Sequence, residues 1–143
     1  MSVSVLIVDD DETVRETLGD FFESIDWVAH RAATATEGRR LAAEQSPDVA
    51  IVDLRLPDAD GLRLVEALRA DDPELAILVL TGHADVATAV RAMRLGAVDL
   101  LEKPIALEGL REAVQSAAER VRERRELALL RERRHSADDA ASV

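Results

Sequence analysis

The sequence predicts an α/β protein, a doubly wound parallel sheet of five strands in the order 2-1-3-4-5 with a C-terminally extended fifth helix. Three observations predict this fold. Five short apolar segments recur at fairly even spacing, stretches with helical periodicity separate them, and 143 residues suffice for one domain plus a short extension. Strands that alternate with helices are parallel and covered on both faces. The segments are Val3–Val8, Val28–Ala32, Val49–Val52, Ala76–Leu80 and Val98–Leu101.

The composition of the segments predicts which strands lie at the edges. The first, third and fourth consist almost only of Val, Ile, Leu and Ala, as expected of strands buried on both faces. The second contains His30 and Arg31 and the fifth contains Asp99, so these two are predicted as edge strands. This arrangement fits the order 2-1-3-4-5, in which the winding reverses between strands one and three and opens a crevice there.

The stretches between the strands are predicted to be helices. Asp11 is a candidate N-cap for a first helix whose apolar face runs from Val14 to Ile25. The weakest helix covers Ala35–Gln45, because Gly38 lies in its interior. The next two helices are marked by Leu62, Val65 and Leu68, and by Val86–Leu95 with Asp85 as N-cap and Gly96 at the C-terminal end.

A last helix is predicted from Leu107 to about Arg134. An a/d-like apolar stripe runs along its first half and is interrupted at Arg124. Two interpretations stay open: a helix whose first half packs on the sheet while its second half frays, or a helix that pairs two subunits. The stripe comprises Leu107, Leu110, Val114, Ala117 and Val121, and it resumes at Leu127 and Leu130.

Composition excludes several function classes. The chain has no cysteine, which removes disulfides, zinc-thiolate sites, iron–sulfur clusters and cysteine nucleophiles. Its formal charge of −11 argues against nucleic-acid binding through a broad basic surface. No segment approaches the roughly 20 consecutive apolar residues of a membrane helix, and the apolar run at the N-terminus is shorter than a secretory signal. We therefore expect a cytoplasmic protein that binds neither nucleic acid nor membranes directly.

Acidic and polar residues follow the strands that meet at the predicted crevice, where open α/β sheets bind their ligands. Strand one is followed by Asp9 and Asp10, and strand three by Asp53. Thr81 follows strand four, and Lys103, the only lysine of the chain, follows strand five. Two carboxylates about 4 Å apart repel each other by roughly 4 kcal/mol at an effective dielectric near 20. A fold tolerates this repulsion for a ligand of opposite sign.

The residue types at the crevice predict the chemistry. An oxygen-only site without histidine or cysteine indicates Mg²⁺ or Mn²⁺, and Mg²⁺ leaves coordination positions open for phosphate oxygens. Lys103 supplies a point charge and Thr81 a hydrogen bond, both suited to a phosphoryl group. Taken singly, a threonine after a strand is more often a turn residue than a phosphate contact, and a Lys-Pro pair such as Lys103–Pro104 is common before a helix. Together the residues predict metal-assisted phosphoryl transfer onto a carboxylate, with Asp53 as the nucleophile.

The same residues lie in stretches that resemble response-regulator receiver domains, the phospho-accepting modules of two-component signalling. The stretches are LIVDDDE, IVDLRLPDADGL, LTGHADVATAVRAMRLGA and LLEKP, and the resemblance covers roughly residues 3–118. It implies a switch and not an enzyme, phosphorylated with Mg²⁺ by a partner histidine kinase, and a cis Lys103–Pro104 bond. By position it assigns phosphorylation and its response to Asp53, Thr81 and Lys103, and the metal to Asp9, Asp10, Asp53 and the backbone carbonyl of Arg55.

Two positions depart from the family pattern. Leu100 stands where the family usually has the Tyr or Phe that moves inward with the threonine, and Ile105 replaces the Phe that commonly follows Lys-Pro. The chain contains no tyrosine. We therefore expect a response that does not depend on an aromatic side chain, reported by the helix over Asp85–Leu95 and its flanking loops.

The chain is most similar in pattern to the receivers of the nitrogen-regulation and dicarboxylate-transport activators. There, a long helix joins the receiver to an ATPase that acts on sigma-54 polymerase. This chain has no GxxxxGK[ST] loop, so it is interpreted as a fragment of a longer transcription regulator or a stand-alone receiver. We expect a receiver domain over 1–120 and a helical linker or dimerisation extension over 121–143, whose last nine residues form a frayed tail. The predicted homodimer uses this helix and the region of helix four and strand five.

Three other functions compete with this interpretation. An aspartate-dependent phosphatase needs a second carboxylate two residues after the nucleophile, where this chain has Arg55. A flavin or nucleotide binder of the same topology is disfavoured by only three aromatic residues and by the absence of a glycine-rich phosphate loop. A phosphorylation-independent dimeric scaffold stays open because of Leu100.

Overall fold

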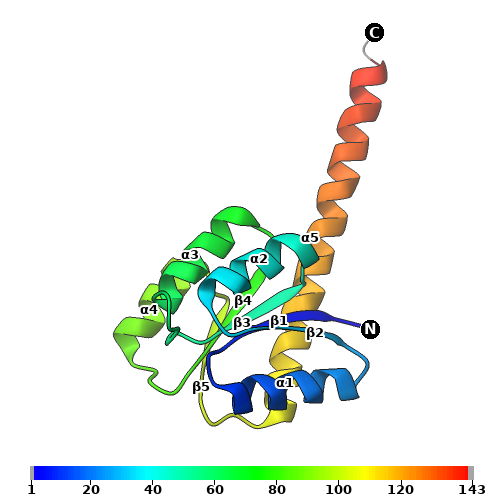
Figure 1. Ribbon diagram of the computed structural model, residues 1–143. Helices are drawn as coiled ribbons and strands as arrows, with labels where there is room; N and C mark the ends of the chain where they lie inside the picture. Colours follow the sequence, from blue (N-terminus) through cyan, green and yellow to red (C-terminus); the bar gives the residue numbers. More distant parts are fainter. Residues whose placement is uncertain (1, 142–143) are drawn as a thin grey trace.

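The computed structural model of the chain describes residues 2–141, and it contains a single five-stranded sheet flanked by helices (Figure 1). The sheet order is β2-β1-β3-β4-β5 with every adjacent pair parallel, so the predicted fold class and strand order are confirmed. The strands are β1 (Ser4–Val8), β2 (Val28–Ala32), β3 (Val49–Val52), β4 (Ala76–Thr81) and β5 (Asp99–Glu102). The helices are α1 (Glu12–Ser24), α2 (Ala35–Gln45), α3 (Gly61–Asp71), α4 (Val86–Arg94) and α5 (Leu107–Ala141).

The sheet is buried on both faces because its central strands are apolar except at their ends, where β1 begins with Ser4 and β4 ends with Thr81. Side chains alternate along a strand, so Val5 and Ile7 of β1 face the core under α1 and α5, whereas Leu6 and Val8 face the core under α2, α3 and α4. Strands β2 and β5 have half-buried or exposed positions, as expected of edges. In the core under α1 and α5, the Phe22 ring stacks on the Trp27 ring with their centroids 5.5 Å apart.

Helix ends lie where the capping residues place them. Asp11 accepts a hydrogen bond from the Val14 N–H at 3.2 Å, and Asp85 accepts one from the Thr88 N–H at 2.7 Å, so both predicted N-caps are confirmed. Gly96 has φ of +111°, the left-handed conformation predicted at the end of α4. These short local motifs direct the loops that connect the strands to α1 and α4.

Helix α5 extends beyond its predicted end at Arg134 to Ala141, because neither Gly nor Pro interrupts its last turns. Seven of the nine residues predicted as a frayed tail are therefore helical, and residues 142–143 lie outside the described residues. The first half of the apolar stripe packs on the sheet, with Leu110, Val114 and Val121 fully buried. Leu127, Leu129 and Leu130 are about half exposed on the part of α5 that projects from the domain (Figure 1).

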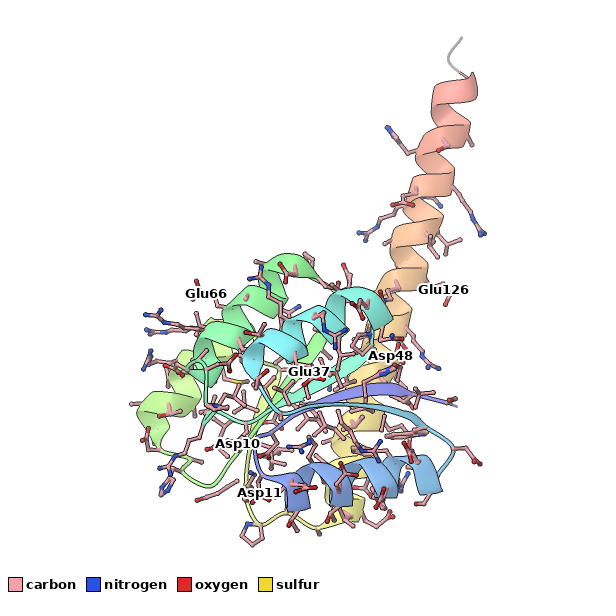
Figure 2. The ribbon with its side chains drawn as sticks, in the orientation of Figure 1. Asp10, Asp11, Glu37, Asp48, Glu66 and Glu126 are labelled. Carbon is pink, nitrogen blue, oxygen red and sulfur yellow. The ribbon has the colours of Figure 1, made fainter. Side chains whose placement is uncertain are left out.

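A buried carboxylate fixes α5 at the point where it leaves the domain. Asp48 is 8% exposed and lies beside α5 (Figure 2). It accepts hydrogen bonds from the Ser4 N–H at 2.9 Å, from Arg122 at 3.1 Å and from Arg125 at 3.2 Å. Side-chain contacts between α5 and the domain therefore continue at least to Arg125, whereas the domain boundary at residue 120 stays a prediction. Within residues 2–141, no helix has the length and apolar character needed to cross a membrane.

Candidate functional site

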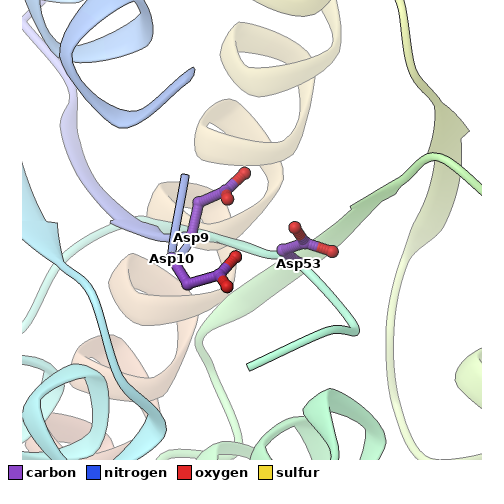
Figure 3. Close-up of side chains that lie close together, drawn as sticks. All are labelled: Asp9, Asp10 and Asp53. Carbon is purple, nitrogen blue, oxygen red and sulfur yellow. The ribbon is translucent and has the colours of Figure 1, made fainter. Parts of the chain in front are cut away.

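Three carboxylates meet at the carboxyl edge of the sheet, at the crevice between β1 and β3. Asp9 and Asp10 directly follow β1, and Asp53 directly follows β3 (Figure 3). One carboxylate oxygen from each lies within 4.8 Å of the others. Asp9 and Asp53 are buried, whereas Asp10 is exposed to solvent. The structure thus places the two predicted acidic positions together, with an opening to solvent on the side of Asp10.

Lys103 bridges the two buried carboxylates. Its Nζ donates to Asp9 Oδ2 at 2.9 Å and to Asp53 Oδ2 at 3.1 Å. Burial alone lowers the pKa of the Lys103 ammonium, but the hydrogen bonds to both carboxylates outweigh burial and raise it. Burial raises the pKa of the Asp9 carboxyl, in spite of the hydrogen bonds from Lys103 and the Asp11 N–H that lower it. One cation therefore balances two buried anions, and the cluster keeps an excess of negative charge.

Backbone amides orient the carboxylates. The Asp11 N–H donates to Asp9 Oδ1 at 2.9 Å, and the Arg55 N–H donates to Asp53 Oδ1 at 3.1 Å. Arg15 of α1 also donates to the backbone carbonyl of Asp9 at 2.9 Å. The Arg55 peptide unit therefore lies beside the Asp53 carboxylate, while its carbonyl as a metal ligand stays a prediction.

Thr81 lies at the end of β4, next to β3 in the sheet, and is 2% exposed. Its Oγ1 accepts a hydrogen bond from the His83 N–H at 3.3 Å, and its carbonyl accepts one from the Lys103 N–H at 2.8 Å. The Lys103–Pro104 bond is cis, as expected. Leu100, paired with β4, is half-buried and packs against the core under α3 and α4. The position that the family gives to a swinging aromatic is thus filled by a branched aliphatic side chain.

Gly61, the first residue of α3, supports the site but was not predicted from the sequence. A Cβ at this position would lie against Leu54 Cα and the Asp53 carbonyl oxygen, closer than a van der Waals contact. The α3 N-terminus thus approaches the loop that carries Asp53 more closely than any residue with a side chain allows. A glycine at the first position of a helix, where other residues have higher helix propensity, is the sequence feature that indicates such an approach.

We predict that Gly61→Ala lowers the free energy of unfolding by about 2 kcal/mol, because the new methyl group meets backbone that cannot move aside without displacing Asp53. Urea unfolding measures the change. Gly109→Ala in α5 is the matched control, since its Cβ meets nothing within 4 Å, and it should stabilise the helix by about 0.5–1 kcal/mol. Equal effects of the two substitutions would contradict the close approach at Gly61.

The residues at the site fit a small divalent cation. The donor set consists only of oxygen atoms, it is negatively charged, and the exposed Asp10 leaves room for the water ligands that Mg²⁺ retains. Within residues 2–141, these three residues are the only group of three or more possible ligands that lie close enough to share a metal ion. When bound, Mg²⁺ would supply positive charge opposite the incoming oxygens of a phosphoryl group.

We predict that Mg²⁺ raises the thermal midpoint. At a Mg²⁺ concentration 100 times its dissociation constant, the free energy of unfolding should rise by about 2.7 kcal/mol. The Asp9 pKa is raised in the folded state, so its ionised form costs stability once the pH exceeds that pKa. Mg²⁺ relieves this cost, so its effect should be large at neutral pH and shrink as the pH falls toward the Asp9 pKa. Melts with MgCl₂ or with NaCl of equal ionic strength test this, and equal shifts from the two salts would contradict it.

Comparison with known proteins decides the family. Residues 5–115 match the response regulator receiver domain family, which is most of the chain. The chain belongs to this family. The resemblance inferred from the sequence is therefore confirmed.

The receiver domain has relatives among regulatory proteins. It is 45% identical over 101 residues to the photosynthetic apparatus regulatory protein RegA of Cereibacter sphaeroides, covering 71% of this chain and 55% of RegA. It is 38% identical over 118 residues to the C4-dicarboxylate transport transcriptional regulatory protein DctD of Pseudomonas aeruginosa, covering 80% of this chain and 25% of DctD. The chain thus spans about half the length of one relative and a quarter of the other.

A solved structure shares the fold and carries a phosphorylated aspartate. A response regulator protein from Burkholderia pseudomallei superposes with a TM-score of 0.74 at 35% identity, covering 87% of this receiver domain and 73% of that chain. That structure is described as containing a phosphorylated aspartic acid, a calcium ion and citrate. The two relatives and the Burkholderia pseudomallei protein are regulatory proteins, in agreement with the prediction of a regulatory role for this chain.

Proposed function

We propose that Asp53 of this receiver domain accepts a phosphoryl group from a partner histidine kinase, with Mg²⁺ as the cofactor. The observation that carries the proposal is the placement of the Asp53 carboxylate beside both the acidic pair and Lys103 at the mouth of the sheet. Asp53 is buried but faces the exposed Asp10, so a donor can approach from one side. The pathway belongs in the cytoplasm, where such kinases present their phosphohistidine.

The side chains divide the reaction between them. An Asp53 carboxylate oxygen attacks the phosphorus atom, the bond between phosphorus and the donor histidine nitrogen breaks, and that nitrogen keeps the electron pair. Lys103, already 3.1 Å from Asp53, compensates the charge that the phosphoryl oxygens bring. Thr81 gives up the contact from the His83 N–H and donates its hydroxyl hydrogen to a phosphoryl oxygen. When Mg²⁺ is bound, Asp9, Asp10, Asp53 and the backbone carbonyl of Arg55 would hold it.

Mass spectrometry of the chain after incubation with a small acyl phosphate tests this function. We expect a single phosphoryl group, located on Asp53, whose formation requires Mg²⁺ and stops when the metal is chelated. Modification without Mg²⁺, or modification spread over several surface carboxylates, would contradict an organised site. Turnover of phosphate esters would favour a phosphatase instead, although Arg55 offers no general acid after Asp53.

We further propose that the receiver domain acts in transcription regulation as a homodimer. The projecting part of α5 exposes Leu127, Leu129 and Leu130, and α4 exposes Val86 and Met93, so both predicted dimer regions present apolar side chains. Residues 1–120 then form the receiver and 121–143 the dimerisation extension. Light scattering with and without beryllofluoride and Mg²⁺ tests the switch. A mass that responds to beryllofluoride supports it, whereas a constant dimer supports the phosphorylation-independent scaffold.

A further inference from the structure

A cavity of about 380 Å³ lies between α3 and α4 and is distinct from the acidic cluster. Its floor includes Leu62 and Leu95, and its charged lining includes Arg63 from α3 and Arg91 and Arg94 from α4. The volume falls in the lower part of the range of about 300–1,000 Å³ that small-molecule sites occupy in proteins. The acidic cluster and its lysine line none of it. The cavity therefore needs an explanation of its own.

Most arginines that precede α5 donate hydrogen bonds to an acceptor, but the three that line this cavity do not. Nine arginines precede α5 in the sequence, and all are within the described residues. Five of them donate hydrogen bonds to carboxylates or backbone carbonyls: Arg15, Arg31, Arg39, Arg40 and Arg69. Of the four without such a bond, three line this cavity, and the fourth is Arg55. Among the arginines that precede α5, those without such a bond are thus concentrated at this cavity.

The acids in the lining do not neutralise these arginines. Asp60 caps α3, where its Oδ1 accepts the Leu62 N–H at 3.0 Å. Glu66 of α3 also lines the cavity, but within residues 2–141 it forms no ion pair with the cavity arginines. Arg91 and Arg94 lie in the last turn of α4, where the helix dipole favours cations, but within residues 2–141 neither side chain donates a hydrogen bond. Arg63 lies in the first turn of α3, where the dipole opposes a cation, so the dipole does not explain it.

We propose that this cavity binds a small multivalent oxyanion, a molecule with two or more phosphate groups. Guanidinium groups bind phosphate oxygens in a bidentate manner, and three of them on two helices span more than one phosphate. Glu66 adds one negative charge to the lining and repels an anion, so a ligand with several negative charges binds better than one with a single charge. Leu62 and Leu95 offer apolar contact for the uncharged body of the molecule. Binding joins α3 to α4, and this assignment is independent of phosphorylation at Asp53.

Calorimetric titration of the full chain with inorganic triphosphate, in metal-free buffer at physiological ionic strength, tests the proposal. The cavity variant combines R63Q, R91Q and R94Q. The matched control combines R131Q, R133Q and R134Q, which removes the same charge from exposed positions of α5. We expect binding by the wild type and the control within about twofold of each other, and binding at least about tenfold weaker by the cavity variant, the equivalent of one charged hydrogen bond.

Amide chemical shifts of the wild type keep the test decisive if the cavity variant folds poorly. Triphosphate should perturb residues 60–66 and 91–96, and leave residues 53, 81 and 103 unchanged. Equal weakening in both triple variants would show unspecific charge attraction and overturn the site. Perturbation at the acidic cluster instead would also overturn it. Binding of an acidic peptide without binding of triphosphate would replace the small-molecule site by a protein-docking surface.

Discussion

Asp53→Asn is expected to reduce phosphoryl incorporation from a small acyl phosphate by at least about 100-fold, because the amide offers no anionic oxygen to attack phosphorus. Asparagine has nearly the same shape as aspartate, and its single carbonyl oxygen can still accept one of the two hydrogen bonds that Arg55 N–H and Lys103 donate to the two oxygens of Asp53. Lys103 also keeps its hydrogen bond to Asp9. The fold should therefore persist while the chemistry stops. The rate of incorporation measured by mass spectrometry gives the result.

Asp99→Asn is the matched control for this substitution. Asp99 lies at the opposite end of the sheet, at the start of β5, and is exposed. Its replacement removes one negative charge without touching the acidic cluster, so incorporation should stay within about twofold of the wild type. If Asp53→Asn kept most of the incorporation, the nucleophile would be another carboxylate, and Asp10 would be the first to test.

Lys103→Gln is expected to lower the free energy of unfolding by about 3 kcal/mol in Mg²⁺-free buffer, because it removes the cation from between two buried carboxylates. Because the Lys103 side chain is 24% exposed, the expected loss lies at the lower end of the range of about 3–5 kcal/mol for breaking a buried ion pair. The same substitution should enlarge the stabilisation by Mg²⁺, since the metal then provides the only positive charge at the cluster. Urea unfolding with and without MgCl₂ measures both effects.

Arg40→Gln serves as the control for the loss of an ion pair. Arg40 pairs with Glu44 at 2.9 Å, but both side chains are more than half exposed, so the loss should stay below about 1 kcal/mol and be independent of Mg²⁺. In combination with Asp9→Asn, Lys103→Gln should cost less than the sum of the two single substitutions. An unchanged Mg²⁺ response in Lys103→Gln would show that lysine and metal do not share the same carboxylates.

The sequence was most informative where short-range patterns decide the structure. Strand identity follows from runs of apolar residues, and edges follow from polar residues such as His30 and Asp99. Caps such as Asp11 and Asp85 accept hydrogen bonds from backbone N–H groups only three residues away, so the sequence alone locates them. The end of α5 was wrong because residues 135–141, HSADDAA, lack an apolar pattern but also lack a helix breaker.

The candidate site was predicted in its members and not in its contacts. The carboxyl ends of parallel strands meet at one edge, which is enough to bring Asp9, Asp53 and Lys103 into one region. Lys103 donates hydrogen bonds to Asp9 and Asp53, which lie 94 and 50 residues before it in the sequence. These contacts depend on the position of the loop after β5, which only the tertiary structure defines. Gly61 and Arg15 were missed because their roles depend on how closely α3 and α1 approach the strand ends.

The amino-acid pattern by itself determined the alternation of strands and helices, the two edge strands and the acids at the strand ends, because periodicity, composition and strand ends are local properties of a chain. Only the tertiary structure decided that Asp48 secures α5 through Arg122 and Arg125, and that three arginines share a cavity between α3 and α4. Residues far apart in sequence acquire such partners only after helices have packed at particular distances and angles, which no local pattern encodes.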